Sequence, residues 1–187
     1  MLVSLGGCAV SGSYPRDWSP AAKGDMVGPC PSIAGRFRNE GTGHPKEAGP
    51  LSLTRLLDLP EGEQVEIAQS REKIEVTVWA AGRPSETVTF TSGEVALSWD
   101  MSKPRTFACP VNIPSGRILL FSHLESGTDS VGGAGGVAAA AGKDVRFAKA
   151  VDGSLIVTVM EGAGVLVGVV PIGWAERVYF RFEAVKD

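Results

Sequence analysis

The sequence contains little of what several large classes of protein require. It has only three cysteines and two histidines, with no Cys-x-x-Cys pair, so a zinc site is not supported. The net charge of −3 argues against the basic surface with which nucleic-acid-binding proteins neutralise phosphates. No apolar run approaches the roughly 20 residues of a membrane-spanning helix. These absences leave a folded chain for which no metal, cofactor or nucleic acid is predicted.

What the sequence has instead is hydrophobicity with a period of two. Between Lys73 and Trp79, for example, Ile74, Val76 and Val78 alternate with polar or amphipathic residues, as in a half-buried strand. Strong turn signals separate such segments, which predicts an all-β fold: an antiparallel meander, barrel or sandwich of about nine or ten strands. Strands are expected at residues 33–38, 64–67, 73–79, 87–91, 95–99, 117–124, 145–147, 155–160, 165–170 and 177–182.

The C-terminal third carries the clearest alternation. Val178, Phe180 and Phe182 should point into the core. Glycine-rich turns are expected at residues 161–164 and 171–173. Residues 165–170 are apolar on both faces, which predicts a central strand covered by the helix or the N-terminal segment.

One short helix is predicted over residues 52–59. Ser52 can cap its first turn, leucines share one face, and Pro60 ends it. With so little helix, an alternating α/β architecture is not expected.

Near the N-terminus, Leu5-Gly6-Gly7-Cys8 resembles the lipobox of bacterial lipoproteins, in which an apolar residue and small residues precede the cysteine that receives lipid. A signal peptide carries a basic region and an apolar region of about 7–15 residues. Only seven residues precede Cys8 and none is basic, so the interpretation requires an upstream extension of the reading frame. Otherwise Cys8 is an ordinary cysteine in a tail.

The next segment, residues 9–32, is rich in Pro, Gly, Ser and Ala and reads as a tether. Tyr14 and Trp18 are unusual in a linker and are expected to dock on the domain. The expected organisation is therefore a signal-peptide remnant at 1–8, the tether at 9–32 and a single β domain at 33–187.

Two motifs add a second resemblance. Tyr14-Pro15-x-x-Trp18-x-Pro20 and the segment from Cys30-Pro31 through Phe37 to Gly41 resemble the N-terminal part of a group of Gram-negative envelope lipoproteins. The resemblance covers about a quarter of the chain. It implies export and lipidation, and it implies no particular activity.

If Cys8 carries lipid, the remaining cysteines are Cys30 and Cys109. A bridge between them would close a loop of about 80 residues, which is worth about 4–5 kcal/mol in the chain-entropy model. The alternative is a pair of buried free thiols in a cytosolic protein.

Other candidate sites favour structural interpretations. The tract 132–142 fits a loose dinucleotide-binding pattern, but a β-patterned segment follows it where a helix is required. His44 is expected in a loop and His123 on a strand, without a nucleophile motif around either. The acidic stretch 61–75 reads as a solvated face, and Trp79 as a surface or interface aromatic.

These observations favour a lipid-anchored component of the bacterial envelope with a binding or structural role and no catalytic residues. Membrane attachment is expected at Cys8, and Ala9 after it predicts the outer membrane by the usual sorting rule. A protein partner in the envelope is a further expectation. Two alternatives remain open: a lipocalin-like barrel that binds a small apolar ligand, and an envelope hydrolase built around His123.

Overall fold

The computed structural model describes residues 9–22, 26–28, 30–93, 106–109, 118–127, 137–167 and 170–186. These residues form mainly antiparallel β-sheet, as the alternation predicts. Nine of the described strands have four or more residues, and the others have two or three. Helical structure in the described part is limited to α1 (Leu53–Leu56) and the 3-10 turn η1 (Lys46–Ala48).

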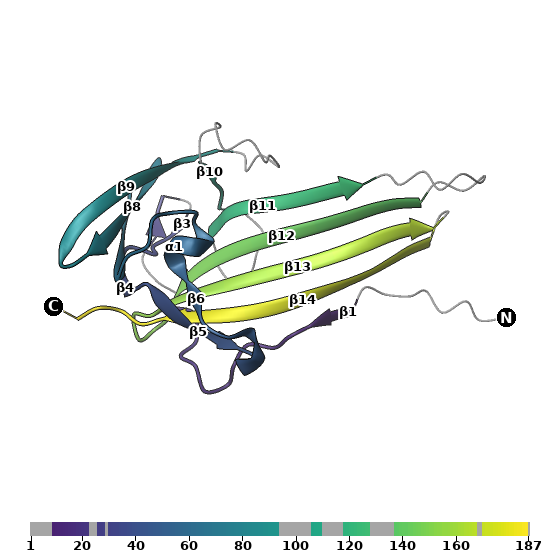
Figure 1. Cartoon of the computed structure of the whole chain (residues 1–187), viewed down its shortest axis with the longest axis horizontal. Helices are drawn as coiled ribbons and strands as arrows, with labels where there is room; N and C mark the ends of the chain where they lie inside the picture. Colours follow the sequence, from purple (N-terminus) through teal and green to yellow (C-terminus); the bar gives the residue numbers. More distant parts are fainter. Residues whose placement is uncertain are drawn as a thin grey trace.

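The strands form two principal sheets and a small ribbon (Figure 1). The seven-stranded sheet has the order β11 (Ile118–Gly127), β12 (Val137–Lys149), β13 (Leu155–Val167), β14 (Val170–Phe182), β5 (Glu40–His44) and β6 (Leu51–Ser52), with β1 (Ala9–Ser11) also paired to β14. The five-stranded sheet has the order β10 (Thr106–Phe107), β9 (Arg83–Ser92), β8 (Lys73–Ala80), β7 (Gln64–Gln69) and β4 (Gly35–Arg38). The ribbon pairs β2 (Met26–Val27) with β3 (Cys30–Pro31).

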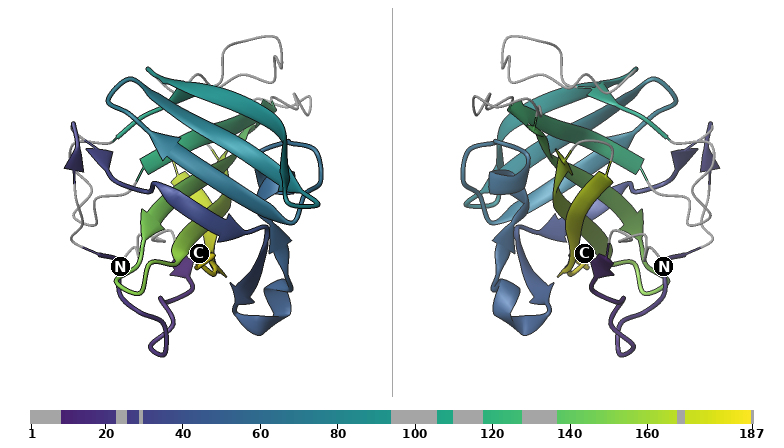
Figure 2. Two further views of the ribbon diagram at one scale, coloured as in Figure 1. Left: turned by 90° about the vertical axis from the view of Figure 1, so that its left-hand side faces the viewer. Right: turned by 90° about the vertical axis from the view of Figure 1, so that its right-hand side faces the viewer.

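The hydrophobic core lies between the two sheets. The five-stranded sheet crosses over one half of the long sheet, and β12, β13 and β14 continue past it (Figures 1 and 2). Phe147, Leu155 and Phe182 of the long sheet are completely buried against the five-stranded sheet's inner face. The predicted inward residues Phe180 and Phe182 belong to this core, and Val178 packs at its margin. Burial of such side chains stabilises the fold by about 1.5–3 kcal/mol each.

The C-terminal third corrects two predictions. The glycine-rich residues 161–164 and 171–173 are not turns: they lie inside β13 and β14, which pair without interruption from Leu155–Phe182 to Val167–Val170. Backbone hydrogen bonds need no side chain, so a glycine can continue a ladder when strands flank it. Nor is 165–170 one central strand covered by the helix, because residues 165–167 end β13 and Val170 begins β14. Helix α1 lies at the other end of the sheet, and β1 pairs with β14 at Trp174–Glu176 (Figure 1).

Of the three-stranded meander predicted over 73–79, 87–91 and 95–99, the first two strands are confirmed as β8 and β9, and the strand expected at 64–67 pairs with β8 as β7. Ala81 and Gly82 connect β8 to β9 with positive φ angles of 49° and 71°. Positive φ at both central residues is the geometry of the tight turns that match the twist of paired strands. The third strand of that meander, expected at 95–99, lies outside the described residues.

A buried asparagine fixes the helix to the sheets. The Asn39 side chain donates to Gly62 O (2.7 Å) and Thr54 Oγ1 (3.0 Å), and its Oδ1 accepts from Thr54 N–H (2.9 Å). Ser52 also donates to Asn39 Oδ1 and accepts from Arg55 N–H, so it caps α1 as predicted. The helix has only one turn and is shorter than the expected 52–59. A helix of this length is not stable by itself, so it depends on these contacts.

We predict that removing residues 177–187 prevents folding. The deletion strips Val178, Phe180 and Phe182 from the core and leaves the backbone groups of Leu155–Met160 without their partners. These are the true neighbours of the terminal strand, in place of the expected 165–170. Each large core side chain lost costs about 2–5 kcal/mol, against a total of about 5–15 kcal/mol. Circular dichroism and thermal melting should show no cooperative transition. A truncated protein that melts near the wild-type temperature would contradict this.

Candidate functional site: the docked N-terminal segment

The chain that follows Cys8 is held on the long sheet from its first described residue. Strand β1 runs parallel to β14, with Ala9 opposite Trp174 and Ser11 opposite Glu176. Further along the same edge of β14, Tyr179–Arg181 pairs with β5. The N-terminal segment therefore occupies an edge of β14 that β5 leaves open. Cys8 itself lies outside the described residues.

Aromatic contacts then fix the segment on the outer face of the sheet. The Tyr14 ring lies edge-on to Tyr179 with 5.4 Å between centroids, and Trp18 makes similar contacts with Tyr14 (6.3 Å) and His44 (6.1 Å). Tyr14 also donates a hydrogen bond to Ser19 O. Tyr179 is only 3% exposed although it lies on the face away from the main core. The prediction that Tyr14 and Trp18 dock on the domain is confirmed.

Backbone hydrogen bonds continue the attachment along the turn between β12 and β13. Ala22 N–H donates to Lys149 O (2.8 Å), Val151 N–H donates to Pro20 O (3.0 Å), and Ala21 forms a bridge with Ala150. Each of these bonds is worth about 1 kcal/mol net. The described part of the expected tether is therefore bound along the domain over much of its length.

Asp152 organises the same turn. It accepts hydrogen bonds from Ser154 N–H (3.0 Å) and Ser154 Oγ (2.6 Å), and it pairs with Arg181 (2.7 Å). Burial by itself raises the pKa of Asp152. The hydrogen bonds from Ser154 and Ser19 and the charge of Arg181 together lower it by more than burial raises it, so the net pKa lies below its ordinary value. The ionised carboxylate thus links the tether to the turn and to β14.

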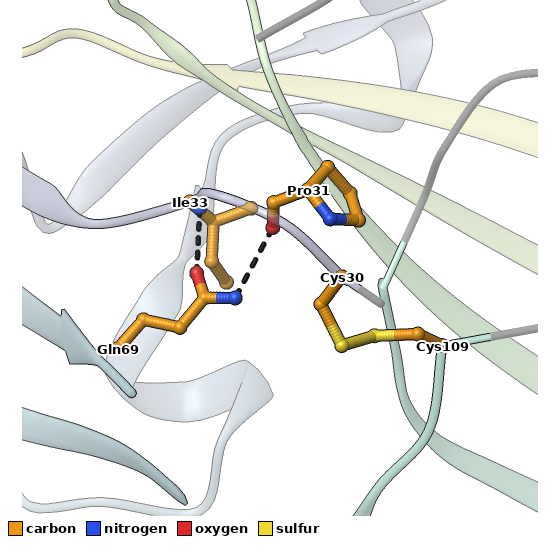
Figure 3. The surroundings of a disulfide bond; sticks show 5 residues. All are labelled: Cys30, Pro31, Ile33, Gln69 and Cys109. Carbon is orange, nitrogen blue, oxygen red and sulfur yellow. Dashed lines mark hydrogen bonds between the residues drawn. A yellow bond between two sulfur atoms is a disulfide. The ribbon is translucent and has the colours of Figure 1, made fainter. Parts of the chain in front are cut away.

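The disulfide fixes the far end of the segment (Figure 3). Cys30 and Cys109 are joined with a Cα–Cα distance of 5.4 Å, in agreement with the predicted pairing. Beside it, Gln69 of β7 accepts from Ile33 N–H (2.8 Å) and donates to Pro31 O (3.2 Å). The bridge and Gln69 together attach the chain leaving the tether to the five-stranded sheet.

The remaining candidate residues lie on different strands of the long sheet. His44 lies at the end of β5 rather than in a loop, and its ring contacts Trp18. His123 lies in β11, in register with Lys143. Residues 137–142 of the glycine-alanine tract belong to β12, so the helix that a dinucleotide loop requires does not follow them.

Trp79 is half-buried and engaged within its own sheet. Its Nε1–H donates to Glu66 (2.9 Å), and the Arg36 guanidinium lies 3.9 Å from the ring centroid. Glu75 pairs with Lys73 at 2.8 Å. Glu66 and Glu75 therefore both interact with neighbouring side chains on a solvated face, as expected. Trp79 belongs to the same face, where its ring is in contact with Arg36.

A pocket of about 420 Å³ lies beside the core, between the inner face of β13–β14 and the segment from β5 to α1. Val159, Val178 and Phe180 contribute apolar surface, and Glu47, Glu161 and Glu176 contribute carboxylates. The space between the two sheets is filled by side chains in the described part.

In comparisons with known proteins, the chain matches no family model, no curated protein and no solved structure. Within the described residues, no helix has the length and apolar character needed to cross a membrane.

Several residues of this site could not be found from the sequence. The pairing of β1 with β14, the clamp by Gln69 and the role of Asp152 depend on contacts between distant segments. Only Asp152-Gly153-Ser154 carried a local signal, since Asp and Gly are typical turn residues.

We predict that Tyr14→Ala loosens the docked segment. Loss of the ring removes its contacts with Trp18 and Tyr179, and an aromatic pair is worth about 0.5–1.5 kcal/mol. Trypsin cleavage after the exposed Arg16 should accelerate roughly tenfold, the equivalent of about 1.4 kcal/mol. Tyr14→Phe keeps the ring and should change the rate much less. Equal cleavage rates in the wild type and Tyr14→Ala would show that this contact does not hold the segment.

We also predict that the purified protein contains the Cys30–Cys109 bridge. Thiol titration of unfolded, unreduced Cys8→Ser protein should detect no free thiol, whereas adding Cys109→Ser should expose one. Because the bridge spans 79 residues, its loss should lower the free energy of unfolding by about 4–5 kcal/mol in denaturant titrations. Two free thiols in the Cys8→Ser protein would refute the bridge and weaken the case for export.

Proposed function

We propose that this protein is a lipid-anchored component of the Gram-negative envelope, attached to the outer membrane through Cys8, with a binding or structural role. The lipobox resemblance at Leu5–Cys8 supplies the anchor, and Ala9 directs the lipoprotein to the outer membrane. No catalytic residues, cofactor or metal form part of the proposal.

The observation that carries the proposal is the attachment of the chain directly after Cys8. Ala9 pairs with Trp174, and contacts through Tyr14, Pro20 and Ala22 follow. A lipid on Cys8 would thus be connected to the sheet without a free linker between them. This supports a role in which the domain is held at a defined position close to the membrane surface.

The disulfide supports the compartment. Such bridges persist in oxidising surroundings, including the bacterial periplasm, and are rare in cytosolic proteins. Cys30 is 4% exposed and its bridge joins two segments that no other strand pairing in the described part connects directly. The proposal also includes a protein partner in the envelope, which would bind to the surface of the domain.

Lipidation is tested by metabolic labelling with a palmitate analogue in cells that express the gene from its upstream start. We expect the wild type to be labelled and Cys8→Ser to lose the label completely. Cys109→Ser removes a different cysteine and should keep the label, which makes it the matched control. Acyl chains contribute about 0.8 kcal/mol per buried CH₂, so only the labelled forms should sediment with membranes.

An unlabelled wild type would overturn the proposal. A label that persists in Cys8→Ser would assign the modification to another residue and would equally reject Cys8 as the anchor.

A further inference from the structure

Three strands of the long sheet, β12, β13 and β14, change character along their length at one row of charged residues, whereas β11 carries Glu125 two residues past it. Lys143, Glu161 and Glu176 lie in register on β12, β13 and β14, and His123 of β11 and Ser11 of β1 complete the row. Glu161 and Glu176 are exposed. On one side of this row the sheet forms the core with the five-stranded sheet.

On the other side, β12, β13 and β14 continue with a wholly uncharged sequence. The paired rows run from Gly142, Gly162 and Ala175 to Val137, Val167 and Val170. They contain only Gly, Ala, Val, Leu, Ile, Pro and Trp. At about 3.3 Å per residue, these rows extend about 17 Å. In Figure 1 this part of the strands projects beyond the five-stranded sheet.

The pairing of β1 shows at which part of the long sheet the first described residues lie. Strand β1 is parallel to β14, and Ala9, the residue that follows Cys8, pairs with Trp174. Trp174 is the second residue of β14 past the charged row, on the uncharged side. The residue that follows the candidate lipidation site is therefore paired at the base of the uncharged strand ends.

We infer that the uncharged ends of β13 and β14 enter the surface layer of the membrane that holds the lipid on Cys8, an inference that rests on the proposed function. Residues 170–173 lie beyond the level of Ala9, which corresponds to about 13 Å of strand. One leaflet contributes about 15 Å of hydrocarbon. The charged row stays on the aqueous side, and Trp174 falls at the interface, where tryptophan is enriched in membrane proteins.

The backbone sets the depth. Pairing with β12 and β14 satisfies β13 along its length, but the outer edge of β14 between Val170 and Gly173 has no partner among the described strands. Unpaired backbone groups are costly in hydrocarbon. The strand ends therefore reach the headgroup and upper acyl region, and they do not cross the bilayer.

The test uses the full chain with Cys8→Ser, a hexahistidine tag at the N-terminus and vesicles that contain nickel-chelating lipid. The tag replaces the acyl anchor, so binding does not depend on lipidation. Val167→Cys in β13 then provides a single free thiol for an environment-sensitive NBD label, and Thr89→Cys on the exposed face of β9 provides the matched control.

We expect the label at position 167 to gain at least twofold in fluorescence, with a blue shift, when the protein binds vesicles. Lipids brominated on their acyl chains should quench it. The label at position 89 should do neither. Adding Leu166→Glu, which places a charge in the uncharged rows, should abolish the response at 167 while the labelled protein keeps its wild-type circular dichroism.

A label at 167 that stays water-exposed on vesicle-bound protein would overturn the inference. A blue shift that appears without vesicles and grows with protein concentration would assign the strand ends to contact with a second copy and would also overturn it. If insertion is seen but Cys8 carries no lipid in cells, the proposed anchor fails and the membrane contact stands. If Cys8 is lipidated and the label stays exposed, only this inference fails.

Discussion

The arrangement of the whole N-terminal segment depends on how one edge of β14 is shared. Along its other edge, β14 pairs with β13 over all 13 residues, so its position is set by the core. Its outer edge is divided between β5 at Tyr179–Arg181 and β1 at Trp174–Glu176. Because β5 is short, backbone groups remain available for β1. The residue after Cys8 is thereby placed on a strand that the core holds.

The segment is secured at several independent points between β1 and the disulfide. Tyr14 packs on Tyr179, Asp152 links Ser19 to Arg181, and Cys30 is bonded to Cys109. These contacts respond differently to solution conditions. Acid protonates Asp152 and weakens its ion pair with Arg181, and a reductant breaks the disulfide, whereas neither changes the aromatic contact. A lipid anchor connected in this way would transmit a fixed orientation to the domain.

The long sheet combines two environments in continuous strands. Near the C-terminal end, alternation places Phe180 and Phe182 in the core and Arg181 outside it. Past Glu161 and Glu176 the alternation ceases in β13 and β14, and every paired row holds only glycine and apolar residues. A strand with one solvated face requires polar residues at every second position. Their absence is the observation on which we base the inferred contact of these strand ends with the membrane surface.

The sequence by itself determined the fold class, the inward side of β8 and β14 and the Ser52 cap, because each follows from local period or capping chemistry. The Cys30–Cys109 pairing followed only on the condition that Cys8 carries lipid. Tertiary structure decided the rest. Strand length in β12–β14 depends on having partners at Gly162 and Gly164, which local turn signals cannot reveal. The place of β1, the clamp by Gln69 and the charged row depend on register between segments far apart in the chain, and a single residue of slip would reverse every side chain.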